Sequence, residues 1–384
     1  MSGGLRRRVG VNLTWLVPGV VGGSEESTVA ALLAVEPLLA TASIDLVLFT
    51  RPALGDAHPS LVATYETVEV DAARGGKIRR IAIENTVLAR ATARHRIDLM
   101  HHAGGTVPLL DRQPATLTLH DLQPLDLPEN FSVAKRRYLS LLLGRSARCA
   151  RQIGVPSEFV RSGVIERLGA DPERVHVVAW SVPPVPVLEP SAVPDVLSTY
   201  GIGERFVLYP AITYPHKNHA VLLEAFAIAA RGDVSVELVL TGGAGPTEPA
   251  VLERISQPDL AGRVHRLGRV PSRYLEALYA GAAMVAFPSR YEGFGLPVLE
   301  AMVRRTPVVV SDAGSLPELV TSDMVTVGVD DIAGWADAMQ SVSSQPQLRR
   351  TLATAGADAA NRFTPERTAA SLLDVWTQAL QEMS

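Results

Sequence analysis

The chain has 384 residues, 47% of them hydrophobic and 20% charged, and its formal net charge is −4. This composition is typical of a globular α/β protein, and the length suits two domains that each bury a core. The negative net charge and the lack of a recognised module argue against a nucleic-acid partner. The single cysteine, Cys149, excludes an internal disulfide and indicates a reducing compartment.

No apolar run approaches the roughly 20 residues that a membrane-spanning helix needs. The first residues, MSGGLRRRVGVNLTWLVPG, soon become polar and glycine-rich, unlike a secretory signal peptide. Residues 74–151 carry 14 Lys and Arg against 6 Asp and Glu. Such a run is usually a solvated helix face, but it would also suit peripheral contact with an anionic membrane. We expect a cytoplasmic protein, with a peripheral position at the inner membrane face as a further option.

The first half of the chain alternates short apolar strands with helical segments. A strand at 9–16 is followed by the loop PGVVGGSEES, an apolar helix and a second strand at 44–50. Further strands are expected near 98–103, 115–121 and 151–157. This alternation predicts a parallel, doubly wound sheet with helices on both faces.

Prolines cluster at 181–196 (SVPPVPVLEPSAVPDV), which predicts a linker. A second strand–helix alternation follows, with strands RFVLYPA, VELVLTGG, RVHRLG, AMVAFPS, TPVVVSD and VTVGV. We predict two Rossmann-like α/β domains that face a cleft. Their expected bounds are 1–185 for the N-terminal domain, 186–200 for the linker, 201–365 for the C-terminal domain, and 366–384 for a helix that packs back on the N-terminal domain.

The segment FPSRYEGFGLPVLEA places two carboxylates, Glu292 and Glu300, around a glycine-proline turn that opens a helix. Pro297 suits the first helical turn, and Gly293 and Gly295 allow a ligand to approach the backbone. The ordinary interpretation is a proline-capped helix with two solvated glutamates. The glycines and the preceding strand favour a binding site instead.

The backbone N–H groups near the start of this helix, around Phe294 and Leu296, would bind an anion. A carboxylate on either side would accept hydrogen bonds from hydroxyl groups. The arrangement therefore suits a ligand with a central diphosphate and hydroxyls at both ends, which is the layout of a nucleotide sugar.

Lys217 lies in YPAITYPHKNH, between a strand end and a helix, where ligands bind in open α/β sheets. A lysine that merely solvates a helix N-terminus would be disfavoured by the dipole, so a role in neutralising a leaving diphosphate is more attractive. His216 and His219 beside it fit either a polar loop or a site equally well.

The first half supplies weaker candidates. Gly22 and Gly23 form a turn before a helix, where backbone N–H groups would meet a phosphate or the acceptor. His120 ends a strand and should lie at the carboxyl edge of the sheet, although a core or capping histidine is the ordinary alternative. His101 and His102 end another strand and are secondary candidates. No Asp-any-Asp triplet or His/Cys cluster with metal-ligand spacing is present, so no metal or other cofactor is expected.

These motifs together resemble the retaining glycosyltransferases of family 4, which have the GT-B fold. The Glu292–Glu300 pair with seven residues between them carries the resemblance. It extends nearly end to end through the segments GGSEE, LHDLQPLDLPENFS, VPSEFVRSGVIERLG, PHKNHAVLLEAF, LTGG, GRV and TPVVVSDAGSLPEL. The PHKNH variant is similar to mannosyl- and rhamnosyltransferases of bacterial polysaccharide assembly.

The resemblance implies a role for each matching residue. By this resemblance, Lys217 would bind the donor phosphates, Glu292 would contact the transferred sugar, and Glu300 would hold the ribose. Gly23 would approach the diphosphate, and His120 would lie near the sugar and acceptor. The backbone near Arg269 and Val270 would contact the base. Many relatives carry an arginine five residues before the lysine, where this chain has Ile212. The expected substitutes for that cation are Arg273, Arg290 or His216.

The sequence thus predicts transfer of a sugar, with mannose favoured over rhamnose or glucose, from a nucleoside-diphosphate donor to a glycan or lipid-linked acceptor with retention of configuration. Two alternatives stay open: a sugar-nucleotide epimerase or hydrolase, and a catalytically silent nucleotide-sugar-binding protein.

Overall fold

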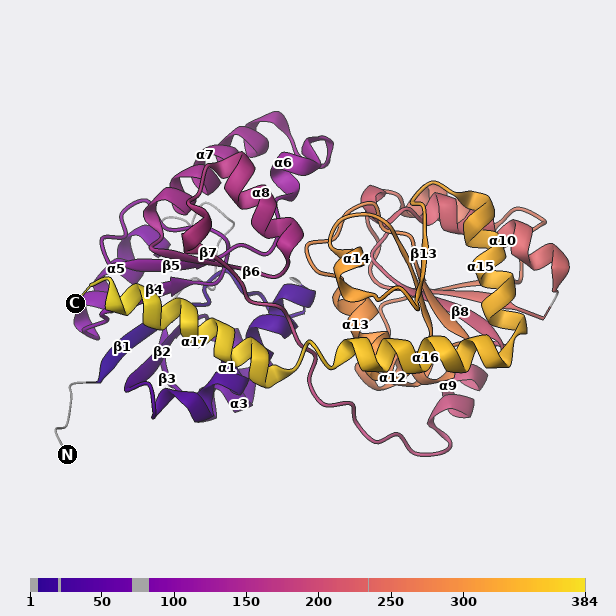
Figure 1. Cartoon of the computed structure of the whole chain (residues 1–384), viewed down its shortest axis with the longest axis horizontal. Helices are drawn as coiled ribbons and strands as arrows, with labels where there is room; N and C mark the ends of the chain where they lie inside the picture. The colour runs from indigo at the N-terminus through magenta and orange to yellow at the C-terminus, as the bar shows by residue number, and fades with distance from the viewer. Residues whose placement is uncertain (1–5, 20–21, 71–82, 234, 384) are drawn as a thin grey trace. The chain divides into compact units, whose positions relative to one another are not determined.

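The computed structural model describes residues 6–19, 22–70, 83–233 and 235–383 (Figure 1). The chain forms two compact units. Unit 1 contains Met1–Pro183 together with Phe363–Ser384, and unit 2 contains Pro184–Arg362. The basic segment RGGKIRR at 74–80, part of the expected membrane contact, lies outside the described residues.

Unit 1 is built on a seven-stranded sheet with the order β3-β2-β1-β4-β5-β6-β7, in which every neighbouring pair is parallel. Its strands are β1 (Arg7–Asn12), β2 (Ile44–Thr50), β3 (Glu66–Glu69), β4 (Leu99–His102), β5 (Ala115–Thr118), β6 (Gln152–Val155) and β7 (Val175–Val177). The five predicted strands are confirmed. The two outermost strands, β3 and β7, were missed because they are short and only partly apolar, so their local pattern is weak.

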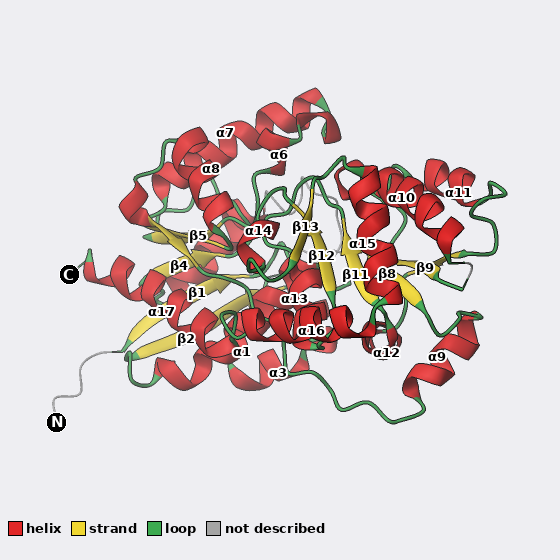
Figure 2. Ribbon diagram, turned by 45° about the vertical axis from the view of Figure 1, so that its right-hand side comes forward, coloured by secondary structure: helices red, strands yellow, loops and turns green. Residues whose placement is uncertain are grey.

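Helices cover both faces of this sheet (Figure 2). They are α1 (Gly23–Leu39), α2 (Ala53–Ala57), α3 (Pro59–Thr64), α5 (Ala89–Arg94), α6 (Gln123–Asp126), α7 (Val133–Cys149), α8 (Glu158–Leu168) and α17 (Pro365–Gln381). The terminal helix α17 packs against α1 within unit 1, and its Leu372, Val375 and Trp376 share one buried cluster with Leu32 and Val35. Burial of these large side chains stabilises the position of the chain's end.

The stretch expected to be a linker, 186–200, is only partly extended. Residues 182–189 have no regular structure, but α9 (Ala192–Tyr200) begins inside the stretch, so that part of the prediction is wrong. Pro194 is compatible with this helix because it lies in the first turn, where a backbone N–H has no intrahelical partner.

Unit 2 has a six-stranded parallel sheet with the order β10-β9-β8-β11-β12-β13. Its strands are β8 (Phe206–Pro210), β9 (Glu237–Thr241), β10 (Val264–Gly268), β11 (Met284–Phe287), β12 (Val308–Ser311) and β13 (Val325–Val327). Its helices after α9 are α10 (His219–Gly232), α11 (Glu248–Ile255), α12 (Ser272–Gly281), α13 (Leu296–Val303), α14 (Leu316–Leu319), α15 (Ile332–Ser344) and α16 (Pro346–Ala360). All six predicted strands are confirmed.

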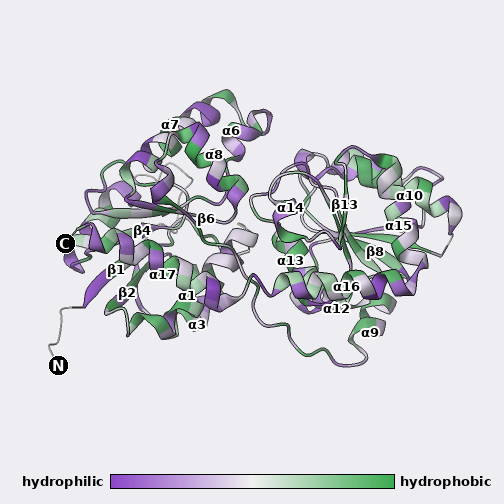
Figure 3. Ribbon diagram, in the orientation of Figure 1, coloured by the Kyte–Doolittle hydropathy of each residue, from purple (hydrophilic) through white to green (hydrophobic). Residues whose placement is uncertain are grey.

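The central strands β8, β11 and β12 of unit 2 are apolar and buried, as in a parallel sheet that helices cover on both faces. In Figure 3, β8 is hydrophobic, whereas α16 carries hydrophilic stretches. The direction of strand progression reverses between β8 and β11. Open α/β sheets bind ligands at the carboxyl ends of strands beside such a reversal. We therefore expect a ligand site in the loops that follow β8 and β11.

Candidate active site

Two of the predicted residues meet at this edge of unit 2. Lys217 follows β8 and Glu292 follows β11, and the Lys217 Nζ lies 2.6 Å from Glu292 Oε1. Their side chains are 18% and 11% exposed, respectively. An ion pair that is partly shielded from water and still reachable from solvent places a cation and a carboxylate together where a ligand would bind.

The loop that carries Lys217 is held by its neighbour. Pro215–Lys217 form a short 3₁₀ turn, and Asn218 then adopts a left-handed conformation with φ of 58°. The buried Asn218 Nδ2 donates to the carbonyl oxygens of Pro288 at 3.1 Å and Val329 at 2.9 Å. Asn218 therefore ties the loops after β8, β11 and β13 together, a role that the sequence analysis did not assign.

Glu292 is also held through its backbone. Ser315 Oγ donates to the Glu292 carbonyl at 3.1 Å. Gly314 has φ of 62°, and a Cβ on it would lie 2.8 Å from the Glu292 backbone nitrogen. Only glycine permits this approach without displacement. Both residues lie in the segment TPVVVSDAGSLPEL, and no site role was predicted for either.

The helix α13 begins directly behind this pair. Its N-cap is Gly295 with φ of 104°, and Pro297 occupies the first turn. A Cβ on Gly295 would lie 2.7 Å from Leu316 Cδ2, so a side chain is excluded there as well. Gly293, Phe294 and Leu296 complete the turn, and the positive end of the helix dipole favours an anion beside Lys217.

Glu300 lies one turn inside α13 and is held by a buried tyrosine. The Tyr279 hydroxyl donates to Glu300 Oε2 at 2.7 Å, and Arg304 Nη1 donates to the Glu300 carbonyl at 2.7 Å. Burial, and then the charge of Glu300, raise the pKa of Tyr279 well above its ordinary value. Tyr279 therefore stays protonated as a donor and fixes the orientation of the Glu300 carboxylate.

The predicted base-binding segment, Arg269 and Val270, follows β10. A Cβ on Gly243 would lie 3.1 Å from Arg269 Nε, so this arginine stands beside the glycine loop after β9. Arg266, whose side chain is 7% exposed, donates to the carbonyls of Gly242 at 2.8 Å and Gly243 at 3.1 Å. The nearly buried Arg266 thus holds this glycine loop through two hydrogen bonds to its carbonyls, a role that was not predicted.

Three residues were expected to replace the cation that is missing at Ile212, and the structure shows the contacts or the charge of each. Burial, and then the charge of Lys217, lower the pKa of His216 to about 4, so His216 is neutral at pH 7 and the prediction that it supplies a cation is wrong. Arg290 Nη1 pairs with Asp330 Oδ2 at 2.9 Å, and Arg273 lies 4.9 Å from the centroid of the Tyr274 ring. Lys217 is therefore the predicted cation that the structure places beside Glu292.

In unit 1, Gly22 precedes α1 with φ of 79°, and Gly23 is the first residue of the helix. A Cβ on Gly22 would meet no atom within 4 Å, so this turn has open space around it. The nearly buried Glu25, in the same first turn, accepts from the Gly19 backbone N–H at 3.0 Å and pairs with His58 Nε2 at 2.8 Å. The Glu25 carboxylate thus joins the first turn of α1 to the preceding loop and to His58.

His120 lies just after β5 between the rings of Trp15 and Trp180, with centroids 5.4 Å and 5.6 Å away. Its Nε2 lies 2.7 Å from the Ala103 carbonyl oxygen, so Nε2 carries the proton and Nδ1 is an acceptor. Nδ1 is buried and has no protein partner. Burial lowers the pKa of His120 to about 4. At neutral pH, His120 is thus suited to accept a hydrogen bond from a hydroxyl.

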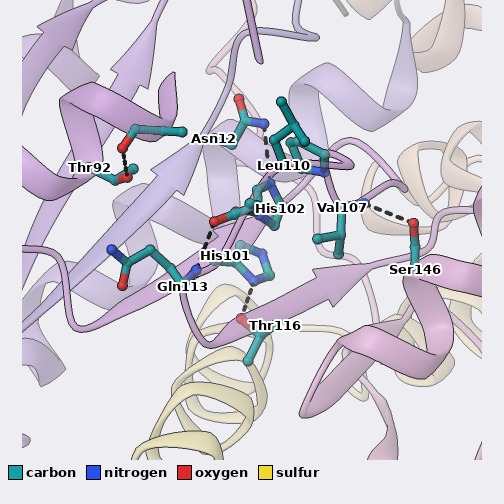
Figure 4. A network of polar contacts seen from close by, with 12 residues as sticks. Asn12, Thr92, His101, His102, Val107, Leu110, Gln113, Thr116 and Ser146 are labelled. Carbon is teal, nitrogen blue, oxygen red and sulfur yellow. Dashed lines mark hydrogen bonds and ion pairs between the residues drawn. The ribbon is translucent and has the colours of Figure 1, made fainter. Parts of the chain in front are cut away.

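The two histidines of β4 take part in separate polar contacts inside unit 1 (Figure 4). His101 contacts the hydroxyls of Thr116 at 2.9 Å and Thr118 at 3.1 Å, and burial lowers its pKa to about 3. His102 pairs with Asp111 at 2.7 Å and contacts Asn12 at 3.3 Å. Their ring nitrogens are already satisfied, which favours a structural role for both.

Over the described ranges, no group of three or more His, Cys, Asp or Glu side chains is arranged to hold a metal ion. None of the described helices is both long and apolar enough to cross a bilayer.

Two family models match the chain. Residues 32–184 match the model described as Glycosyltransferase Family 4, and residues 201–359 match the model described as Glycosyl transferases group 1. The first match lies in unit 1 except for its last residue, and the second lies in unit 2.

Curated relatives include two O-antigen chain mannosyltransferases. The chain is 27% identical to RfbU of Salmonella typhimurium and 32% identical to mannosyltransferase B of Escherichia coli, over 64% and 63% of its own length. It spans 64% of the length of each of these relatives. It is also 33% identical to a D-inositol 3-phosphate glycosyltransferase of Xylanimonas cellulosilytica, over 56% of this chain and 54% of that one.

Solved structures share the whole fold at low identity. Sucrose-phosphate synthase of Thermosynechococcus elongatus superposes with a TM-score of 0.76 at 21% identity, covering 99% of this chain and 100% of that one. Anabaena HepE in complex with UDP and glucose gives a TM-score of 0.75 at 20% identity, covering 97% and 100%. These likenesses establish the GT-B fold.

Proposed function

The chain belongs to the family 4 glycosyltransferases of GT-B fold, and from this premise we propose that it transfers a sugar from a nucleoside-diphosphate donor to a glycan or lipid-linked acceptor. The observation that carries the proposal is the contact between Lys217 and Glu292 at the carboxyl edge of unit 2, beside the start of α13. A diphosphate with an attached sugar offers a negative group to Lys217 and hydroxyl groups to Glu292.

In the proposed reaction, Lys217 and the α13 terminus stabilise the negative charge that develops on the leaving diphosphate. The bond between the anomeric carbon and the phosphate oxygen breaks, and its electron pair goes to that oxygen. The acceptor hydroxyl oxygen bonds to the anomeric carbon on the same face and gives its proton to the departing phosphate oxygen, with retention of configuration. Glu292 contacts the sugar, and Glu300 contacts the ribose.

Within unit 1, Gly22, Gly23 and His120 are proposed as binding residues for a phosphate, a sugar or the acceptor. The glycine turn offers backbone N–H groups, and His120 Nδ1 accepts from a sugar or acceptor hydroxyl. The pKa of about 4 makes His120 a poor acid at neutral pH, so its proposed contribution is orientation of a hydroxyl.

Mannose is the favoured sugar because the first two relatives named above are mannosyltransferases, with rhamnose and glucose as the next candidates. Thermal unfolding with GDP-, UDP- and dTDP-sugars tests this choice, since a ligand at one hundred times its Kd stabilises the folded state by about 2.7 kcal/mol. The largest rise in Tm should come with GDP-mannose. A rise with none of the three classes would contradict the donor assignment.

Incubation of the stabilising donor with and without an acceptor separates the proposal from its two alternatives. A transferase gives product only with acceptor, whereas an epimerase or hydrolase converts the donor alone. A silent binding protein is stabilised by the donor and forms no product. The anomeric proton coupling of the product in NMR spectra reports retention or inversion.

We also propose that the reaction needs no divalent metal, because Lys217 and the helix terminus would carry the diphosphate charge. Turnover should therefore persist in excess EDTA. A loss that Mg²⁺ or Mn²⁺ restores would overturn this part of the proposal.

Contact with an anionic membrane through 74–151 is a further part of the proposal. Its described helix α7 exposes Val133, Tyr138 and Leu141 beside basic side chains such as Lys135. This composition suits the interface of a bilayer. Co-sedimentation with vesicles that contain phosphatidylglycerol should fall in Leu141→Ser, and equal binding by this variant and the parent would contradict a role for α7.

A further inference from the structure

A second basic feature of unit 2 lies at the amino-terminal edge of its sheet. A groove of about 320 Å³ forms where β8, β11 and β12 begin, and α16 provides its other wall. Its basic lining residues are Arg205, Arg305, Arg349 and Arg350. Among the described residues that line it, Glu204 is the sole acid. We call this feature the arginine groove.

Most of the positive charge in the groove is not compensated by carboxylates. Arg205 Nη1 pairs with Asp233 Oδ2 at 3.0 Å. Within the described parts of the chain, Arg305, Arg349 and Arg350 form no ion pair. Arg349 Nη1 donates to the carbonyls of Val342 at 2.9 Å and Ser343 at 2.7 Å, which fixes its guanidinium at the groove wall. Neighbouring like charges are unfavourable unless an anion joins them.

Arg305 provides an independent indication. It follows the end of α13 with φ of 57°, a left-handed conformation in which a Cβ is unfavourable and glycine is the usual residue. Its side chain is exposed, so no packing offsets this cost. A strained exposed arginine at the rim of a basic groove indicates that the guanidinium itself is used.

We propose that the arginine groove binds a phosphate-bearing small ligand. Guanidinium groups bind phosphate oxygens through paired, charge-assisted hydrogen bonds, and the volume suits one small molecule. The groove is separate from the proposed donor site: Lys217 and Glu292 follow the carboxyl ends of β8 and β11, whereas the groove residues precede the amino ends of β8 and β12.

Calorimetric titration of the full chain with inorganic phosphate and with pyrophosphate tests the proposal. All proteins in the test carry Lys217→Ala, so that the donor edge contributes little to binding and the outcome does not depend on the proposed function. We expect Arg305→Gly and Arg350→Gln each to raise the Kd about tenfold, because each removes one charged donor. Arg231→Gln, an exposed arginine of α10 outside the groove, is the matched control and should bind as the parent does.

Arg305→Gly also separates binding from folding. Glycine relieves the left-handed backbone, so the Tm of this variant should not fall while phosphate binding weakens. No binding by the parent, or equal Kd values for Arg305→Gly and Arg231→Gln, would overturn the proposal.

The source of the phosphate is decided with vesicles of phosphatidylglycerol in phosphatidylcholine. If Arg305→Gly and Arg231→Gln sediment equally with vesicles but differ in phosphate affinity, the ligand is a free phosphate compound. If Arg305→Gly also loses vesicle binding, the ligand is a lipid headgroup. Either result, together with the expected Kd change, supports the groove as a phosphate site.

Discussion

Individual residues at the edge of unit 2 owe their chemistry to what surrounds them. Lys217 faces Glu292 at 2.6 Å, so its charge is balanced until an anion arrives. His216, its neighbour in the chain, is neutral at pH 7 because burial lowers its pKa to about 4. These two adjacent residues therefore differ in charge, because burial and then the charge of Lys217 lower the pKa of His216 below its ordinary 6.5.

Replacement of this lysine tests the assignment most directly. Lys217→Ala should lower turnover about a hundredfold, since a preorganised group that stabilises transition-state charge contributes on this scale. Steady-state kinetics with donor and acceptor would measure it, with the exposed Arg231→Ala as control. Turnover near that of the wild type would refute a catalytic role for Lys217.

Asn218 offers a second test at this scale. Asn218→Gly keeps the left-handed backbone but loses two hydrogen bonds, each worth about 1 kcal/mol, whereas Asn218→Ala also pays about 1 kcal/mol or more for φ of 58°. Stability should fall in the order wild type, glycine variant, alanine variant. The donor KM should rise in both variants because the Lys217 loop loosens. An alanine variant as stable as the glycine variant would contradict this account.

At the scale of elements, the site depends on loops that approach one another closely. The loop after β12 supports the loop after β11 through Gly314 and Ser315, and the loop after β8 is clamped by Asn218. These contacts join segments that follow different strands. The parallel sheet brings them together because its strands all end at the same edge.

Gly314→Ala and Gly262→Ala form a matched pair for this idea. Both glycines have positive φ, 62° and 76°, so backbone strain destabilises both variants by about 1–2 kcal/mol. Only at Gly314 would the new Cβ meet another backbone, that of Glu292, whereas no atom lies within 4 Å at Gly262. Thermal unfolding and turnover should therefore show destabilisation in both but a large loss of turnover in Gly314→Ala alone. Similar turnover in the two variants would argue against a role for this contact.

At the scale of the whole molecule, both units bury neutral histidines. Burial lowers the pKa of His101 in unit 1 to about 3, and that of His216 and His219 in unit 2 to about 4, from an ordinary 6.5. The unfolded chain therefore binds protons that the folded chain does not as the pH falls below 6.5. By linkage, the contribution of these neutral histidines to stability is fully present above pH 6.5 and decreases as the pH falls towards 4.

Denaturant unfolding across this range should show a free energy of unfolding that decreases with decreasing pH. His101→Gln should make the decrease shallower, because one fewer site takes up a proton on unfolding. A slope equal to that of the wild type would contradict this account, because it would show that folding does not change the pKa of His101.

The sequence by itself determined the fold class, because strand and helix patterns are local consequences of burial on both faces of a parallel sheet. It also singled out Lys217 and Glu292, since glycines and proline mark where the backbone turns at a strand end. Only the tertiary structure decided that these two, 75 residues apart, form an ion pair. It likewise decided that Asn218 clamps three loops, that His216 is neutral and that Arg305 borders a basic groove. Those features depend on which strands lie side by side and on how deeply a side chain is buried. Both depend on residues far apart in the chain, so a short sequence segment does not predict them.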